Sequence, residues 1–109
     1  MTVEKMIRGN DVAVIVSPGY GAGWSSWCRE HAVFLMFDKT LVKMKEKKVS
    51  EEEVEKYLKS KFGSDQHIYC GGWDKAKIEW VTIGAKLRID EYDGYETLIE
   101  LSEEEYITA

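Results

Sequence analysis

The sequence is poor in proline and cysteine and contains no long apolar run. Its 109 residues include one proline and two cysteines. A single proline and the absence of any low-complexity tract exclude a collagen-like chain or a linker. No apolar run reaches the ~18–20 residues that a membrane-spanning helix requires. We therefore expect no membrane partner.

Positive charge is also scarce. Fifteen lysines and arginines stand against twenty aspartates and glutamates, which gives a formal net charge of −5 at pH 7. Non-specific nucleic-acid binding relies on neutralising phosphates with basic side chains. The composition therefore predicts that nucleic acid is not a partner.

The two cysteines, Cys28 and Cys70, form no CxxC pair. The segment 1–5 lacks the basic region followed by an apolar stretch that marks a signal peptide. We therefore expect two reduced thiols in a protein of the cytoplasm, with a Cys28–Cys70 disulfide as the less favoured alternative.

Hydrophobic residues make up 44% of the chain, which is enough for a core. The length predicts a single domain, residues 1–109. Because a chain of this size buries a limited fraction of its surface, we expect a homo-oligomer.

The order of patterns along the chain is strands, then helices, then strands. This order predicts an α+β fold, a mostly antiparallel sheet with two to three helices packed on one face. The expected strands are a weak one within 3–8, a buried central one at 11–16, and three near 77–82, 85–92 and 95–101. The expected helices run from Ser25 or Ser26 to about 37, from 39 to 48 with Asp38 as N-cap, and from 51 to 62. The capping box Ser50-Glu51-Glu52-Glu53 predicts the start of the third helix, and Gly63 predicts its end.

Asp93-Gly94 is the strongest local signal, because a type I′ turn needs positive φ at both central residues. The turn predicts that Tyr92 faces Tyr95, and that Asp90 and Arg88 face Thr97 and Ile99. The opposite face would carry Leu87, Ile89 and Leu98, with Glu91, Glu96 and Glu100 alongside.

Residues 17–27 form a glycine-rich loop between a strand and a helix. Backbone N–H groups at such a place bind anions. Within it we select Tyr20, Gly21, Gly23, Trp24, Ser25 and Ser26 as candidate ligand-binding residues. The loop lacks the P-loop lysine, and its glycine spacing differs from GxGxxG. A glycine-rich turn around buried tryptophans is an equally weighted alternative.

Two further places could contribute to a ligand site. The segment Cys70-Gly71-Gly72 is followed by Trp73 and Asp74, which could close a pocket against the first loop. Arg88 could hold a phosphate or carboxylate with two hydrogen bonds, and Asp90 lies two residues further along the strand. The structural alternatives are a tryptophan packed on the sheet and an ion pair on a solvated surface.

Other chemistry has weaker support. Cys28, His31 and His67 could suggest a thiol nucleophile with a base, but no orienting third residue is identifiable. Two cysteines and two histidines occur at no zinc-ligand spacing, so we predict no metal and no cofactor. The lysine and glutamate runs within 43–61 are interpreted as a solvated helical face.

Three stretches resemble small proteins encoded by bacteriophages and prophages. They are residues 8–25 (RGNDVAVIVSPGYGAGWS), 71–74 (GGWD) and 88–94 (RIDEYDG). The resemblance implies a small protein of the infected cell's cytoplasm. One class in that setting is the sponge, an oligomer that sequesters a cyclic or ADP-ribose-type immune nucleotide, as Thoeris anti-defence proteins do.

The leading hypothesis is therefore non-enzymatic binding of a small anionic, nucleotide-like immune signal. Loop amides from Gly21 to Ser26 and Arg88 would hold phosphate, an aromatic ring (Tyr20, Trp24 or Trp73) would stack on the base, and Asp74 or Asp90 would accept hydrogen bonds. One alternative is an acidic protein-interaction module that inhibits a host protein. Another is a small hydrolase or lyase of a nucleotide signal, using Asp74, Asp90, His31 or His67.

Overall fold

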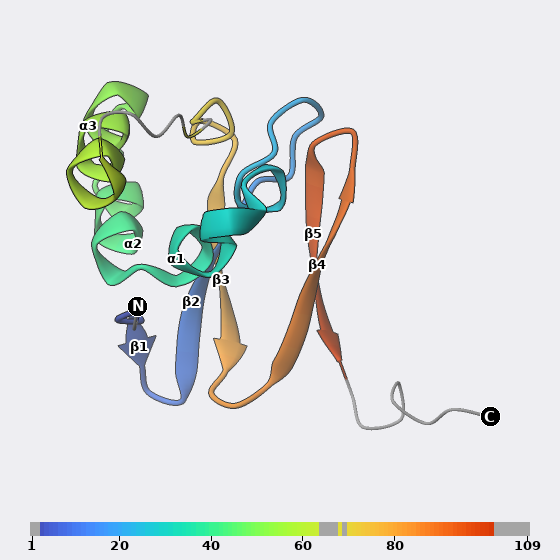
Figure 1. Cartoon of the computed structure of the whole chain (residues 1–109). Helices are drawn as coiled ribbons and strands as arrows, with labels where there is room; N and C mark the ends of the chain where they lie inside the picture. Colours follow the sequence, from blue (N-terminus) through green and yellow to red (C-terminus); the bar gives the residue numbers. More distant parts are fainter. Residues whose placement is uncertain (1–2, 64–67, 69, 102–109) are drawn as a thin grey trace.

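The computed structural model describes residues 3–63, 68 and 70–101. This part of the chain has an α+β fold with antiparallel strands, as expected (Figure 1). In chain order the elements are β1 (Ile7–Arg8), β2 (Asp11–Val16), the 3-10 turns η1 (Ser25–Trp27) and η2 (Arg29–His31), the helices α1 (Ala32–Phe37), α2 (Lys39–Glu46) and α3 (Glu51–Phe62), and the strands β3 (Lys77–Thr82), β4 (Lys86–Tyr92) and β5 (Tyr95–Leu101).

The strands form two sheets rather than one. β1, β2 and β3 form a three-stranded antiparallel sheet with β2 in the centre, as its apolar run predicts. The turn between β1 and β2 contains Gly9, whose φ is +59°. β4 and β5 form a separate two-stranded sheet, which we call the hairpin.

β2 is buried on both faces, and this explains its uninterrupted apolar sequence. Ala13 and Ile15 belong to the core that also contains Leu35, Leu41 and Leu58 of the helices. The alternate residues Val12, Val14 and Val16 pack with Met36 and Val81, and Leu87, Ile89 and Leu98 of the hairpin cover them. Figure 1 shows α2 and α3 on one side of the three-stranded sheet and the hairpin on the other, and Met36 of α1 packs on the hairpin side.

Two helices begin where the sequence predicts; α3 also ends as predicted, whereas α2 ends at Glu46, before the expected residue 48. Asp38 caps α2, since its carboxylate accepts a hydrogen bond from the Leu41 N–H at 3.1 Å. Ser50 caps α3 through the Glu53 N–H at 3.3 Å, and Gly63, with φ +100°, ends this helix.

The expected helix from Ser25 or Ser26 to Phe37 is wrong in its first half. Two 3-10 turns occupy 25–31, and the α-helix is limited to Ala32–Phe37. Cys28, at φ −136° and ψ 68°, interrupts the helical backbone. Trp27 is 43% exposed instead of contributing to a buried stripe.

In the described residues, no helix is long and apolar enough to span a bilayer.

Candidate functional site

The hairpin has the predicted register. Tyr92 pairs with Tyr95, and Asp90 and Arg88 pair with Thr97 and Ile99. Asp93 and Gly94 have φ of +48° and +86°, as a type I′ turn requires. The predicted faces are also confirmed, because Leu87, Ile89 and Leu98 pack against the three-stranded sheet.

The carboxylate of Glu96 is buried against the glycine-rich loop. The residue is 1% exposed. Its Oε1 accepts a hydrogen bond from the Ser17 N–H at 3.0 Å. Its Oε2 accepts from the N–H groups of Trp24 and Ser26, each at 2.9 Å, and from the Ser26 hydroxyl. The loop is therefore an anion-binding loop whose anion belongs to the protein itself.

The expectation of bare amides in this loop is wrong for two further residues. The Gly21 N–H donates to the Asp93 carbonyl at 2.6 Å, and the Ala22 N–H donates to the Gly19 carbonyl at 3.0 Å. The loop thus binds both the turn of the hairpin and the first residues of β5. Its amides hold the fold together rather than facing outward to a phosphate.

Glycines in this region allow close packing. A Cβ on Gly72 would lie 2.3 Å from the Ala22 carbonyl oxygen, and one on Gly94 would lie 2.8 Å from the Ala22 nitrogen. A Cβ on Gly23 would lie 2.4 Å from the Trp27 ring. The two glycine-rich segments therefore meet, but they meet in the interior, where the Ser17 hydroxyl donates to the Gly72 carbonyl at 3.1 Å.

Trp24 and Trp73 lie together inside the protein. They are 0% and 1% exposed, and their ring centroids are 5.5 Å apart. Each indole N–H donates to a backbone carbonyl, that of Leu35 at 2.8 Å and that of Val49 at 2.7 Å. Neither ring can stack on a ligand. The alternative of a glycine-rich turn around buried tryptophans is closer to the structure, although the second tryptophan is Trp73 and not Trp27.

Tyr20 is the one proposed stacking residue that is accessible. Its side chain is 70% exposed, and its ring contacts those of Tyr95 and Tyr92 at centroid distances of 5.1 and 6.3 Å. Ser25 is buried. The ten sequence-selected residues therefore do not form one pocket in the structure.

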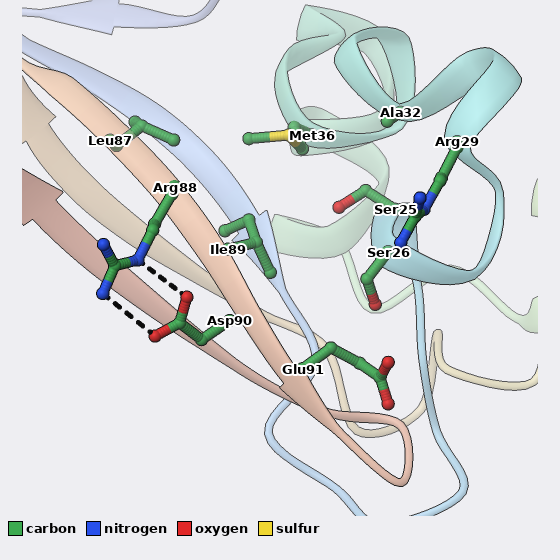
Figure 2. A pocket seen from close by; sticks show the side chains of 10 residues that line it. All are labelled: Ser25, Ser26, Arg29, Ala32, Met36, Leu87, Arg88, Ile89, Asp90 and Glu91. Carbon is green, nitrogen blue, oxygen red and sulfur yellow. Dashed lines mark hydrogen bonds and ion pairs between the residues drawn. The ribbon is translucent and has the colours of Figure 1, made fainter.

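A pocket of about 710 Å³ lies between β4 and the segment that contains η1, η2 and α1 (Figure 2). It contains four of the predicted residues and a balanced set of charges. Figure 2 shows that Arg88 and Asp90 lie on the side of β4 that faces away from α1, with the Arg88 Nε 2.8 Å from the Asp90 carboxylate. The pocket is lined by Ser25, Ser26, Arg29, Ala32, Met36, Leu87, Arg88, Ile89, Asp90 and Glu91.

A second pocket, about 510 Å³, combines the predicted residues Trp73 and Asp74 with three lysines. We call it the lysine pocket. The interpretation of the 43–61 lysines as a solvated face did not separate Lys45 and Lys48 from the others. The lining has a net of two positive charges. The sequence pattern does not show this, because Lys45 and Lys77 come together only where α2 lies beside β3. The pocket is lined by Lys45, Lys48, Val49, Trp73, Asp74, Ala76, Lys77 and Ile78.

Lys45 is the most constrained cation of this pocket. Its ammonium donates to the Trp73 carbonyl oxygen and lies 4.6 Å from the centroid of the Trp73 ring. Partial burial lowers the pKa of Lys45, and the nearby charge of Asp74 opposes that change. The ammonium is therefore partly desolvated and held in one place.

Three of the four residues considered for thiol or metal chemistry lie in the described part of the chain. Cys28 and Cys70 are free thiols. Burial, followed by the charges of Glu55 and Glu51, raises the pKa of Cys70 to about 11. His31 stacks on Phe62 at 3.9 Å, and His67 is outside the described residues. In the described chain, no three His, Cys, Asp or Glu side chains gather as a metal site would require.

Comparisons with known proteins identify no relative: no family model, curated protein or solved structure matches the chain.

Proposed function

We propose that this protein binds a small anionic, nucleotide-like ligand without transforming it, and that the lysine pocket is the binding site. The observation that carries the proposal is the charge of the lining. Its lining contains three lysines and one carboxylate, Asp74, in a chain whose net charge is −5. The larger pocket beside β4 has two arginines and two carboxylates and so favours no anion.

The lining offers a complementary group for each part of a nucleotide. Lys45, Lys48 and Lys77 would neutralise phosphate, and the partly desolvated Lys45 ammonium gains most, because Coulomb attraction grows as water is excluded. Val49 and Ile78 provide apolar surface for a base. Asp74 would accept hydrogen bonds from ribose hydroxyls or base N–H groups.

The ionisable groups of the lining are three lysines and Asp74, and their roles in this proposal are charge neutralisation and hydrogen bonding of the ligand. Whether Asp74 or Lys45 also transfers a proton is decided by the product analysis below. A protein of this type would act by holding its ligand, as the sponge class implied by the phage resemblance does. We place that action in the cytoplasm of the host.

Isothermal titration against cyclic dinucleotides, cyclic trinucleotides and ADP-ribose isomers tests the proposal. We expect one compound to release heat, and the Lys45→Met and Lys77→Met variants to bind it about tenfold more weakly. Lys56→Met, on the exposed face of α3, removes the same charge and should leave binding unchanged. The proposal is wrong if no compound binds and the denatured protein releases no ligand.

Product analysis after incubation separates this function from the alternatives. An intact ligand supports sequestration, and a cleaved ligand shows a hydrolase or lyase. A co-purifying host protein, with no small ligand bound, would instead support the protein-interaction module.

A further inference from the structure

Strand β4 has one edge that no strand of the described chain covers. Its partner on the other edge is β5, and these two strands form the whole of their sheet. The two-residue turn closes on the pair Tyr92 and Tyr95, so successive residues of β4 alternately point their backbone groups toward β5 and away from it. The N–H and C=O groups of Leu87, Ile89 and Glu91 therefore point outward.

The same alternation on β5 agrees with an observed hydrogen bond. Glu96 is out of phase with Tyr95, so its N–H should point away from β4. It does, since it donates to the Ser17 carbonyl at 2.9 Å. This contact on β5 agrees with the register of the hairpin, and the same register assigns the outward groups on β4.

A groove runs along this outward edge. The 710 Å³ pocket is lined by five consecutive residues of β4, Leu87 to Glu91, and on its other side by η1, Arg29 and α1 (Figure 2). A backbone that pairs with β4 would lie in this groove. Met36 and Ala32 would then lie beside this added backbone, on the face of β4 from which the Ile89 side chain projects.

The charges along β4 are complementary to those of a second β4 strand that runs antiparallel to it. The strand reads Lys86-Leu-Arg-Ile-Asp-Glu91, with positive residues first and negative residues last. We propose that β4 pairs antiparallel with β4 of a second copy, with Ile89 opposite the partner's Ile89. Arg88 then lies opposite the partner's Asp90, and Asp90 opposite the partner's Arg88.

Backbone hydrogen bonding and side-chain charge both favour this register over its neighbours. It places all three outward residues, Leu87, Ile89 and Glu91, in hydrogen-bonded pairs across the two-fold axis. The two neighbouring registers that preserve this pairing put Arg88 opposite itself or Asp90 opposite itself, and like charges at directly opposed positions destabilise a sheet. The dimer is isologous and closed, and it covers an edge that would otherwise be open to further pairing.

The proposal concerns a different surface from the lysine pocket and does not depend on ligand binding. Sedimentation equilibrium of the full chain tests it with four proteins: wild type, Arg88→Glu, Lys56→Glu and the double variant R88D/D90R. Arg88→Glu and Lys56→Glu change the net charge equally, but only the first faces the partner. The double variant exchanges the two charges and restores opposite signs in the same register.

We expect a concentration-dependent dimer for the wild type and for Lys56→Glu. Arg88→Glu should raise the dimer dissociation constant about tenfold or more, and the double variant should recover most of that loss. Arg88 and Asp90 are more than half exposed, so these variants should fold, and far-UV circular dichroism checks this.

Amide hydrogen exchange distinguishes this dimer from one formed elsewhere. The amides of Leu87, Ile89 and Glu91 should become slower to exchange as protein concentration rises, while the loop amide of Ile83 should not change. A wild type that stays monomeric at all concentrations overturns the proposal. So does a dimer in which Arg88→Glu has no effect or these three amides stay unprotected.

Discussion

The carboxylate of Glu96 lies 2.9 Å from the backbone nitrogen of Trp24, a residue 72 positions earlier in the chain. This contact joins the start of β5 to the glycine-rich loop after β2. The same carboxylate binds the amides of Ser17 and Ser26. A loop with the composition of a ligand site is thus occupied by a side chain of its own protein.

Replacing Glu96 with glutamine should destabilise the fold by about 2–4 kcal/mol. Glutamine keeps the size of the side chain but loses the charge, and its NH₂ group turns a donor toward the loop amides. Urea denaturation measures the change. Glu100→Gln, an exposed change further along β5, should alter stability by less than about 0.5 kcal/mol. Equal effects of the two variants would show that the buried carboxylate is not a structural anchor.

Gly72→Ala should be more destabilising than Gly84→Ala. A Cβ at Gly72 would meet the Ala22 carbonyl oxygen at 2.3 Å, whereas nothing lies within 4 Å of one at Gly84. Gly84 has φ +83°, so its alanine variant should cost about 1 kcal/mol of backbone strain. The Gly72 variant must displace backbone and should cost about 2–3 kcal/mol. Thermal denaturation of both variants compares them, and the reverse order would contradict close packing of the loops.

Asp38→Ala should cost more stability than Ser50→Ala, although both residues cap helices. The Asp38 carboxylate also accepts a hydrogen bond from the Tyr57 hydroxyl at 2.7 Å and is buried. We expect a loss of about 2–3 kcal/mol for Asp38→Ala and about 1 kcal/mol for the exposed Ser50 cap. Tyr57→Phe measures the tyrosine bond separately. A Ser50 variant as unstable as the Asp38 variant would refute this ranking.

Stability should fall as the pH rises from about 9 to about 11. Burial raises the pKa of Cys70 from its ordinary value of 9.0 to about 11, so the unfolded chain releases this proton first. The contribution is complete below pH 9 and is lost as the pH passes 11. Cys70→Ala should flatten this part of the stability profile. Parallel profiles for wild type and Cys70→Ala would exclude the effect.

Local patterns predicted the elements that depend on local chemistry. Asp93-Gly94 gave the register of the hairpin, because few residues adopt positive φ at two adjacent positions. Asp38 and Ser50 predicted where two helices begin, because their side chains accept hydrogen bonds from amides three residues further along the chain. The long helix after Ser25 was wrong because the backbone leaves helical geometry at Cys28, with φ −136° and ψ 68°, which no local pattern reveals.

The candidate site was harder to predict, because its charges come from separate elements. Lys45 lies on α2 and Lys77 on β3, and neither stands out within its own run of sequence. Trp73 and Asp74 were selected for a pocket with the glycine-rich loop, but they line the lysine pocket instead. Trp73 contributes there a carbonyl that accepts from Lys45 and a ring over which the Lys45 ammonium lies, rather than an open stacking face.

The sequence by itself determined the α+β class, the central strand, the two helix caps and the hairpin with its two faces. Each of these depends on residues close in the chain, whose backbone preferences act before any packing. Only the tertiary structure decided which anion the loop amides bind, which tryptophans are buried, and which lysines share a pocket. Those outcomes depend on segments far apart in the chain, and their distances are set by the packing of the hairpin and of α2 and α3 on opposite faces of one sheet.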